Sequence, residues 1–106
     1  MTEDIYTRQY LLWSLQRALL GEVTPELRGV TARIEERDVF SRFLFDVELT
    51  PEISERVSDA ETEVIADYGG FSPVRFTAEF VSTTADLRLL DDEVWAYRRY
   101  EAPSNP

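Results

Sequence analysis

The sequence contains no cysteine and no histidine among its 106 residues. Without cysteine the chain can form no disulfide, no thiolate metal site and no cysteine nucleophile. Without histidine it lacks the commonest general base and the commonest transition-metal ligand. These two absences exclude Ser-His-Asp catalysis, zinc-dependent hydrolysis and pH sensing by histidine.

Lysine is also absent, so all eleven basic residues are arginine, against 21 acidic residues and a net charge of −10. A charge of this sign opposes binding to nucleic acid or to an anionic membrane and favours a cationic partner. The absence of lysine has three open explanations: a GC-rich genome, the use of arginine to hold carboxylates bidentately, and a halophilic host. We expect neither a nucleic-acid partner nor a membrane partner.

Long hydrophobic runs are missing, because no apolar segment approaches the roughly 18 residues that a membrane span needs. The N-terminus, Met1-Thr2-Glu3-Asp4, is acidic and is not typical of a secretion signal, so we expect a cytoplasmic protein. The 43% hydrophobic content and the six Phe, five Tyr and two Trp residues are typical of a globular protein. The length indicates one domain, which we place at residues 1–101, followed by a flexible tail at 102–106.

The first helical pattern covers residues 3–20, where Thr2 supplies a cap and apolar residues recur at helical spacing. Trp13 and Leu20 widen its apolar side, and Gly21 suits the position after the last helical residue. We therefore predict a helix that packs on the core along this side.

A second helix is predicted at residues 51–68. Pro51 stands at the first helical position, after Thr50, and Gly69-Gly70 ends the pattern. The residues that recur at helical spacing are apolar, and we expect them to face the core: Ile53, Val57, Ala60, Val64, Ile65 and Tyr68.

Four segments alternate in the manner of strands, at residues 27–35, 39–49, 74–81 and 93–100. The first two are separated by a short turn, which is typical of an antiparallel hairpin, and Val39, Phe43, Phe45 and Val47 share one side of the second. A polar loop is expected at 82–92. The order α-β-β-α-β-β predicts an α+β domain with two layers, in which both helices lie on one face of a four-stranded, mainly antiparallel sheet. The pattern leaves the order of the strands open.

Six acidic residues and one arginine in residues 51–68 carry half of the net charge, −5 of −10. Four of the acids are each four residues apart on one line and two flank them: Glu55, Asp59, Glu63 and Asp67, with Glu52 and Glu61. Like charges at this spacing destabilise an isolated helix by about 0.2–0.5 kcal/mol per pair, so local helix energetics does not explain them. They indicate either a binding face for a basic protein or a solvated face that keeps the domain soluble.

The last predicted strand is rich in residues that anchor interfaces, namely Trp95 and Tyr97 followed by Arg98 and Arg99. Alternation puts Trp95, Tyr97 and Arg99 on one side. This side could bind a partner, pair with a second copy in a homodimer, or belong to the core beside a protected edge.

A hydrolase could work with a pair of carboxylates alone. Alternation points Asp46 and Glu48 to the same side of the second strand, which would suit such a pair. The same spacing is common on solvent-facing strands. Acids at 35–38 and 91–93 could offer oxygens to a cation, but neither group has calcium-loop spacing and both are typical of turns. No phosphate loop, nucleophile elbow or dinucleotide fingerprint is present. We predict no catalytic residue, no metal site and no cofactor.

Two segments and the end of the last strand carry a family resemblance: RALLGEVTPELRGV at residues 17–30, TEVIADY at 62–68 and YRR at 97–99. Together with the element order, they resemble small acidic immunity-like proteins of bacterial toxin systems, including contact-dependent inhibition, from about residue 6 to 101. The resemblance implies a non-catalytic protein that binds a cognate toxin domain and blocks it. Many such toxins are basic nucleases, which suits an acidic inhibitor.

The leading hypothesis is therefore an immunity protein that neutralises a basic toxin domain, and the alternative is a self-associating structural module, so that monomer and homodimer both stay open. The predicted partner-binding residues come from the charge and aromatic patterns: Glu52, Glu55, Asp59, Glu61, Glu63, Asp67, Trp95 and Tyr97.

Overall fold

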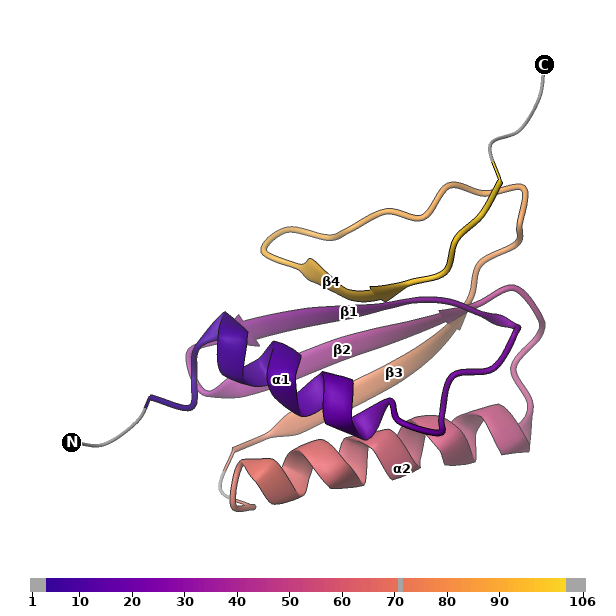
Figure 1. Ribbon diagram of the computed structural model, residues 1–106. Helices are drawn as coiled ribbons and strands as arrows, with labels where there is room; N and C mark the ends of the chain where they lie inside the picture. The colour runs from indigo at the N-terminus through magenta and orange to yellow at the C-terminus, as the bar shows by residue number, and fades with distance from the viewer. Residues whose placement is uncertain (1–3, 71, 103–106) are drawn as a thin grey trace.

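The computed structural model describes residues 4–70 and 72–102. Six elements follow one another along the chain (Figure 1): α1 (Arg8–Ala18), β1 (Leu27–Glu35), β2 (Asp38–Phe45), α2 (Pro51–Asp67), β3 (Val74–Phe80) and β4 (Val94–Arg98). The predicted order α-β-β-α-β-β is confirmed. The tail predicted from residue 102 onward lies, beyond its first residue, outside the described residues.

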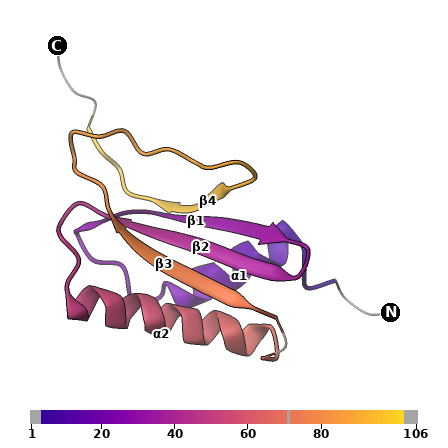
Figure 2. The same ribbon diagram turned by 180° about the vertical axis from the view of Figure 1, so that it is seen from behind.

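The four strands form one sheet in the order β3-β2-β1-β4. β1 is antiparallel to both β2 and β4, whereas β2 and β3 are parallel. The sheet is therefore mixed, and the prediction of a mainly antiparallel sheet is correct for two of its three pairings. The parallel pair arises because α2 is the crossover between β2 and β3 and returns the chain to the end of the sheet where β2 began (Figure 2).

The core lies between the sheet and the two helices. Its buried side chains form one cluster to which both helices and the two central strands contribute, including Leu11, Leu15, Val30, Val39, Phe43, Val57 and Val64. Burial of one such aliphatic or aromatic side chain stabilises the fold by about 1.5–3 kcal/mol. Because both helices bury their apolar sides in the same cluster, they cover the same face of the sheet.

The first helix is shorter than predicted, because α1 begins at Arg8 and the prediction placed its start at residue 3. Thr7 is extended and its side chain accepts a hydrogen bond from the Tyr10 amide at 3.1 Å, so Thr7 is the cap. Upstream, the Tyr6 amide donates to the Asp4 carboxylate at 2.8 Å, which stabilises a turn in place of helix. The predicted cap, Thr2, lies outside the described residues.

The second helix matches its prediction, and its ends show why. Thr50 accepts a hydrogen bond from the Ile53 amide at 3.2 Å, and Pro51 occupies the first turn. Gly69 and Gly70 follow the helix with φ of 67° and 75°, a region that glycine enters without steric cost. None of the helices in the described part of the chain combines the length and apolar character required to cross a bilayer.

β2 ends at Phe45, four residues before the predicted end. The Asp46 amide donates to the Glu26 carbonyl at 2.9 Å, and the chain leaves the sheet there. Val47, which alternation placed on the inner face, is consequently exposed.

A register shift in β4 corrects the predicted distribution of its aromatic residues. Tyr97 lies opposite Val30, but Trp95 lies opposite the next residue of β1, Thr31. A bulge of this kind moves one residue out of the alternation. Tyr97 therefore packs against the core, while Trp95 lies on the other face of the sheet, where its ring covers Gly29. The prediction that Trp95 and Tyr97 share one side is wrong.

The segment 82–92 has no regular structure, as predicted, and it runs beside β4 on the side away from β1 (Figure 1). Two arginines of the sheet hold its backbone. Arg28 donates to the carbonyls of Ser82 and Ala85, both at 2.9 Å, and Arg42 donates to the Arg88 carbonyl at 2.9 Å. The segment is thus fixed to the sheet by charged donors.

Candidate partner-binding surface

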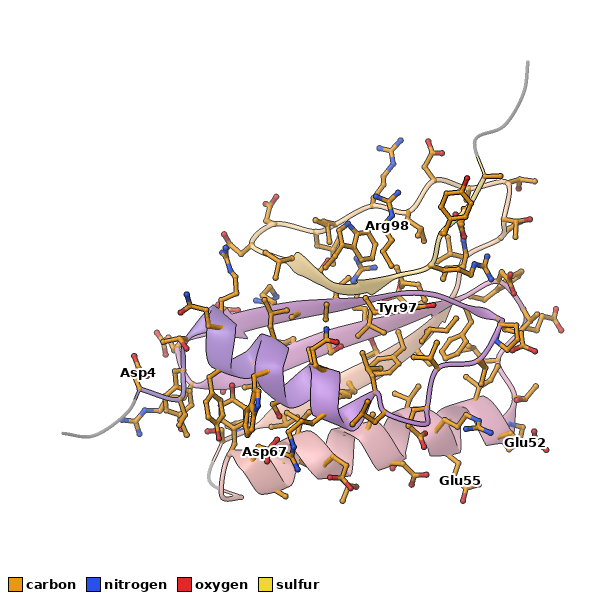
Figure 3. All side chains as sticks on the ribbon, viewed as in Figure 1. Asp4, Glu52, Glu55, Asp67, Tyr97 and Arg98 are labelled. Carbon is orange, nitrogen blue, oxygen red and sulfur yellow. The ribbon has the colours of Figure 1, made fainter. Side chains whose placement is uncertain are left out.

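Four acids lie on the solvent side of α2, and we call them the outer acidic stripe: Glu52, Glu55, Asp59 and Glu63. All four residues are exposed, and within residues 4–70 and 72–102 none takes part in an ion pair. Figure 3 shows Glu52 and Glu55 pointing away from the sheet. The helix places them there because the residues that it buries, Val57, Ala60 and Val64, lie on its opposite side.

Asp67, predicted to belong to the same surface, is bound inside the molecule. Its carboxylate accepts hydrogen bonds from the Ser14 hydroxyl at 2.6 Å and from Arg17 at 2.8 and 2.9 Å. Its backbone carbonyl accepts from the Tyr10 hydroxyl at 2.7 Å. Asp67 thus connects the end of α2 to α1, and Figure 3 shows it directed toward that helix.

Glu61 also makes an internal contact. Its carboxylate accepts a hydrogen bond from the Phe76 amide at 2.8 Å. Phe76 belongs to β3, an edge strand of the sheet, and amides on a free edge attract the strands of other chains. Glu61 therefore covers one position of this edge. The helical spacing that identified the six acids could not separate these two from the four of the outer acidic stripe.

A groove of about 420 Å³ lies between the end of α1 and α2. Its lining includes Asp59 and Glu63 of the stripe together with Leu20 and with Glu22, which the sequence did not single out. Leu20 is 79% exposed, although its spacing predicted a place on the core side of the helix. The helix ends at Ala18, so helical spacing does not extend to Leu20.

The aromatic residues of β4 do not extend this surface. Tyr97 packs against the core, and Trp95 is half-buried with the Arg98 guanidinium 5.4 Å from its ring. In Figure 3, Arg98 lies on the far side of the molecule from Glu52 and Glu55. The homodimer hypothesis relied on pairing of the aromatic last strand, and it stays a prediction.

Asp46, one of the two carboxylates considered for a hydrolase, is bound to an arginine of the fold. Arg99 donates to Asp46 at 2.8 Å, and β2 ends at Phe45, so Asp46 and Glu48 do not share a side of a strand. Among the acids at 35–38 and 91–93, Glu36, Asp91 and Asp92 lie in turns, and Glu36 and Asp92 have φ of 55° and 66°. The described residues contain no cluster of three or more acidic side chains that could hold a metal ion.

Two ion-pair networks connect arginines of the sheet to acidic residues in and around β4. In the first, the Arg42 guanidinium donates to Glu93 at 2.7 and 2.8 Å. Burial alone would raise the pKa of Glu93, but hydrogen bonds from Arg42, the Leu90 amide and Thr31 outweigh it and hold the pKa below its usual value. In the second, Arg28 and Arg99 both bind Glu101, and the hydrogen bond from Arg28 is the largest cause that lowers the Glu101 pKa to about 2.

The geometry defines the class of protein: a small two-layer α+β domain with four exposed acids on one helix. Its most buried carboxylate, Glu93, is neutralised within the fold. The chain belongs to the MafI2 immunity protein family, whose sequence profile matches residues 8–101. This confirms the resemblance to immunity-like proteins of bacterial toxin systems and is consistent with an inhibitor that is not an enzyme.

No curated protein shows significant sequence similarity to the chain. Among solved structures, a chain in the complex of the tri-AMPylated Shewanella oneidensis HEPN toxin with the MNT antitoxin is similar, with a TM-score of 0.55 and 9% identity. The alignment covers 88% of this chain and 74% of that chain. At this identity the likeness concerns the fold alone.

Proposed function

We propose that this protein neutralises a cognate bacterial toxin by binding its toxin domain directly, without catalysis, through a surface centred on the outer acidic stripe. The observation that carries the proposal is the set of four exposed acids that have no ion-pair partner among the described residues, in a chain of an immunity protein family. The partner surface that suits them is basic, and the cytoplasm of the producing cell is the place where such protection is needed.

The four carboxylates of the stripe together produce one region of negative potential. Acids four residues apart are separated by about 6 Å along a helix axis, which is shorter than the screening length of about 8 Å at physiological ionic strength. Their potentials therefore add, and a basic surface is attracted and oriented before contact. Such complementarity acts mainly on the association rate and on the choice of partner.

The fold is compatible with this role, since a similar fold occurs in a solved complex of a toxin with an antitoxin. Neutralisation by direct binding requires only a tight complex, so this protein would need no catalytic residues.

The first experiment is a growth assay. The toxin domain encoded beside this gene is expressed alone and together with this protein. Killing by the toxin alone and rescue by co-expression are the expected results. Killing that co-expression does not relieve would contradict the proposed function.

A kinetic experiment then tests the stripe. Replacing Glu52, Glu55, Asp59 and Glu63 by the corresponding amides should slow association with the toxin by about tenfold or more at low salt and flatten its salt dependence. The matched control replaces four exposed acids elsewhere and changes the net charge equally: Glu36, Asp86, Asp91 and Asp92. Equal slowing in both variants would mean that net charge, and not the stripe, attracts the toxin.

A further inference from the structure

Trp13 is a large aromatic side chain that the fold leaves outside the core. It lies on α1 and is 50% exposed, although its spacing predicted a place on the core side of the helix. The buried side of α1 is narrower than predicted, since it consists of Leu11, Ser14, Leu15 and Ala18. Trp13 therefore presents aromatic surface that a second molecule could bury.

Two neighbours hold the Trp13 ring in position. The centre of the Tyr10 ring lies 5.3 Å from that of Trp13, and the Arg17 guanidinium lies 5.1 Å from the Trp13 ring centre. Both neighbours are themselves bound to Asp67, whose carbonyl accepts from the Tyr10 hydroxyl at 2.7 Å and whose carboxylate accepts from Arg17 at 2.8 and 2.9 Å. A side chain that is already ordered loses little conformational freedom when a partner covers it. Its burial therefore contributes more affinity than burial of a freely moving side chain.

The surface around Trp13 is continuous with the outer acidic stripe. Trp13 lines a hollow of about 610 Å³, whose lining in the described part of the chain includes one acid, Asp4, and no basic residue. Arg17, in contact with the Trp13 ring, lines the groove of about 420 Å³ that two acids of the stripe also line. Acids outnumber bases in both hollows, so the ring lies within a region of negative charge.

This charge specifies which molecule can cover the ring. A second copy of the chain would bring a further net charge of −10 to this surface, and the two copies would repel each other. A basic protein surface is attracted instead. Its arginine and lysine side chains combine a cation, which is attracted to the face of an indole ring, with a methylene stem that packs on apolar surface.

We infer that Trp13 is the anchor of the toxin interface, on which the basic surface of the toxin domain packs. The inference rests on the proposed function and assigns separate roles within it: the outer acidic stripe accelerates association, and burial of Trp13 prolongs the lifetime of the complex. Tryptophan is enriched among the few residues that dominate the affinity of protein interfaces. Tyr10 and Arg17 act as positioning residues for the ring.

Dissociation kinetics of the toxin complex test the anchor. Trp13→Ala should raise the dissociation rate by about tenfold or more and change the association rate by less than about twofold, the reverse of the stripe variant. Trp13→Phe should recover part of the lost lifetime, because it keeps an aromatic ring. The matched control is Tyr100→Ala, which should change neither rate. Tyr100 is 85% exposed and follows β4, the edge of the sheet away from β3 and α2 (Figure 1).

A second measurement leaves the anchor in place. The protein is labelled with fluorotryptophan, so that its two tryptophans, Trp13 and Trp95, each give one fluorine NMR resonance, and unlabelled toxin is added. We expect the Trp13 resonance to move and to lose its dependence on light or heavy water as solvent. The Trp95 resonance should stay unchanged, because that ring lies against Gly29 on the other face of the sheet.

The outcomes separate this inference from the proposed function. A toxin complex that leaves the Trp13 resonance unchanged, or that Trp13→Ala shortens in lifetime no more than Tyr100→Ala does, overturns the anchor and leaves the proposed function standing. A wild-type protein that does not bind the toxin overturns both.

Discussion

Glu93 provides the sharpest test of how this fold is held together. Its side chain is 3% exposed. It accepts four hydrogen bonds at 2.7 to 2.9 Å, from Arg42 Nε and Nη2, the Thr31 hydroxyl and the Leu90 amide. These donors come from β1, β2 and the segment 82–92. We predict that Glu93→Ala destabilises the protein more than removal of any exposed acid.

The magnitude follows from what the substitution leaves behind. The Arg42 side chain is 15% exposed and would keep only Glu79, at 3.3 Å, and the Arg88 carbonyl as partners. Removing one member of a buried ion pair costs about 3–5 kcal/mol, because the other charge stays buried. A small domain is stable by about 5–15 kcal/mol in total, so the variant should lose a large fraction of its stability.

Urea unfolding followed by circular dichroism measures this loss as the difference in free energy of unfolding. The matched control is Glu35→Ala, because Glu35 pairs with Arg33 at 2.8 Å on the surface and its side chain is 69% exposed. Exposed pairs contribute about 0–1 kcal/mol. If Glu93→Ala costs no more than Glu35→Ala, the argument that burial gives this ion pair its importance is refuted.

Two further predictions concern the C-terminal side of the sheet. The Glu101 pKa of about 2 lies below its ordinary value of 4.5, so the stability due to this group is present above about pH 4.5 and is lost as the pH falls toward 2. Urea midpoints measured between pH 5 and pH 2 should therefore fall more steeply for the wild type than for Glu101→Gln, and parallel curves would contradict the role of Arg28 and Arg99. Gly29→Ala should destabilise by about 1–3 kcal/mol, because a Cβ there would lie 2.7 Å from Cζ3 of Trp95. Its thermal midpoint should recover in part when Trp95→Leu is added, and a single variant as stable as the wild type would show that the ring moves freely.

Periodicity in the sequence determined the elements themselves. Period-two alternation located β1 at its observed bounds, and the proline and glycines around α2 located that helix to within one residue. These signals are reliable because each is a property of neighbouring residues in the chain. The acidic character of α2 is likewise readable from composition and spacing, and so is the absence of histidine and cysteine chemistry.

Tertiary structure decided how the elements meet and which charges are free. Strand order, the parallel pairing of β2 with β3 and the bulge that separates Trp95 from Tyr97 all depend on partners distant in the chain. The same holds for the acids of α2, since Asp67 and Glu61 are bound by residues of α1 and β3.

The groove at Glu22 was not visible in the sequence for the same reason. Its carboxylates come from a loop and from a helix more than thirty residues further along the chain, and only packing of α1 on α2 brings them together. Helical spacing tells which acids share a face of one helix. Whether an acid on that face is bound internally or left for a partner depends on the neighbouring element, and local patterns carry no information about that neighbour.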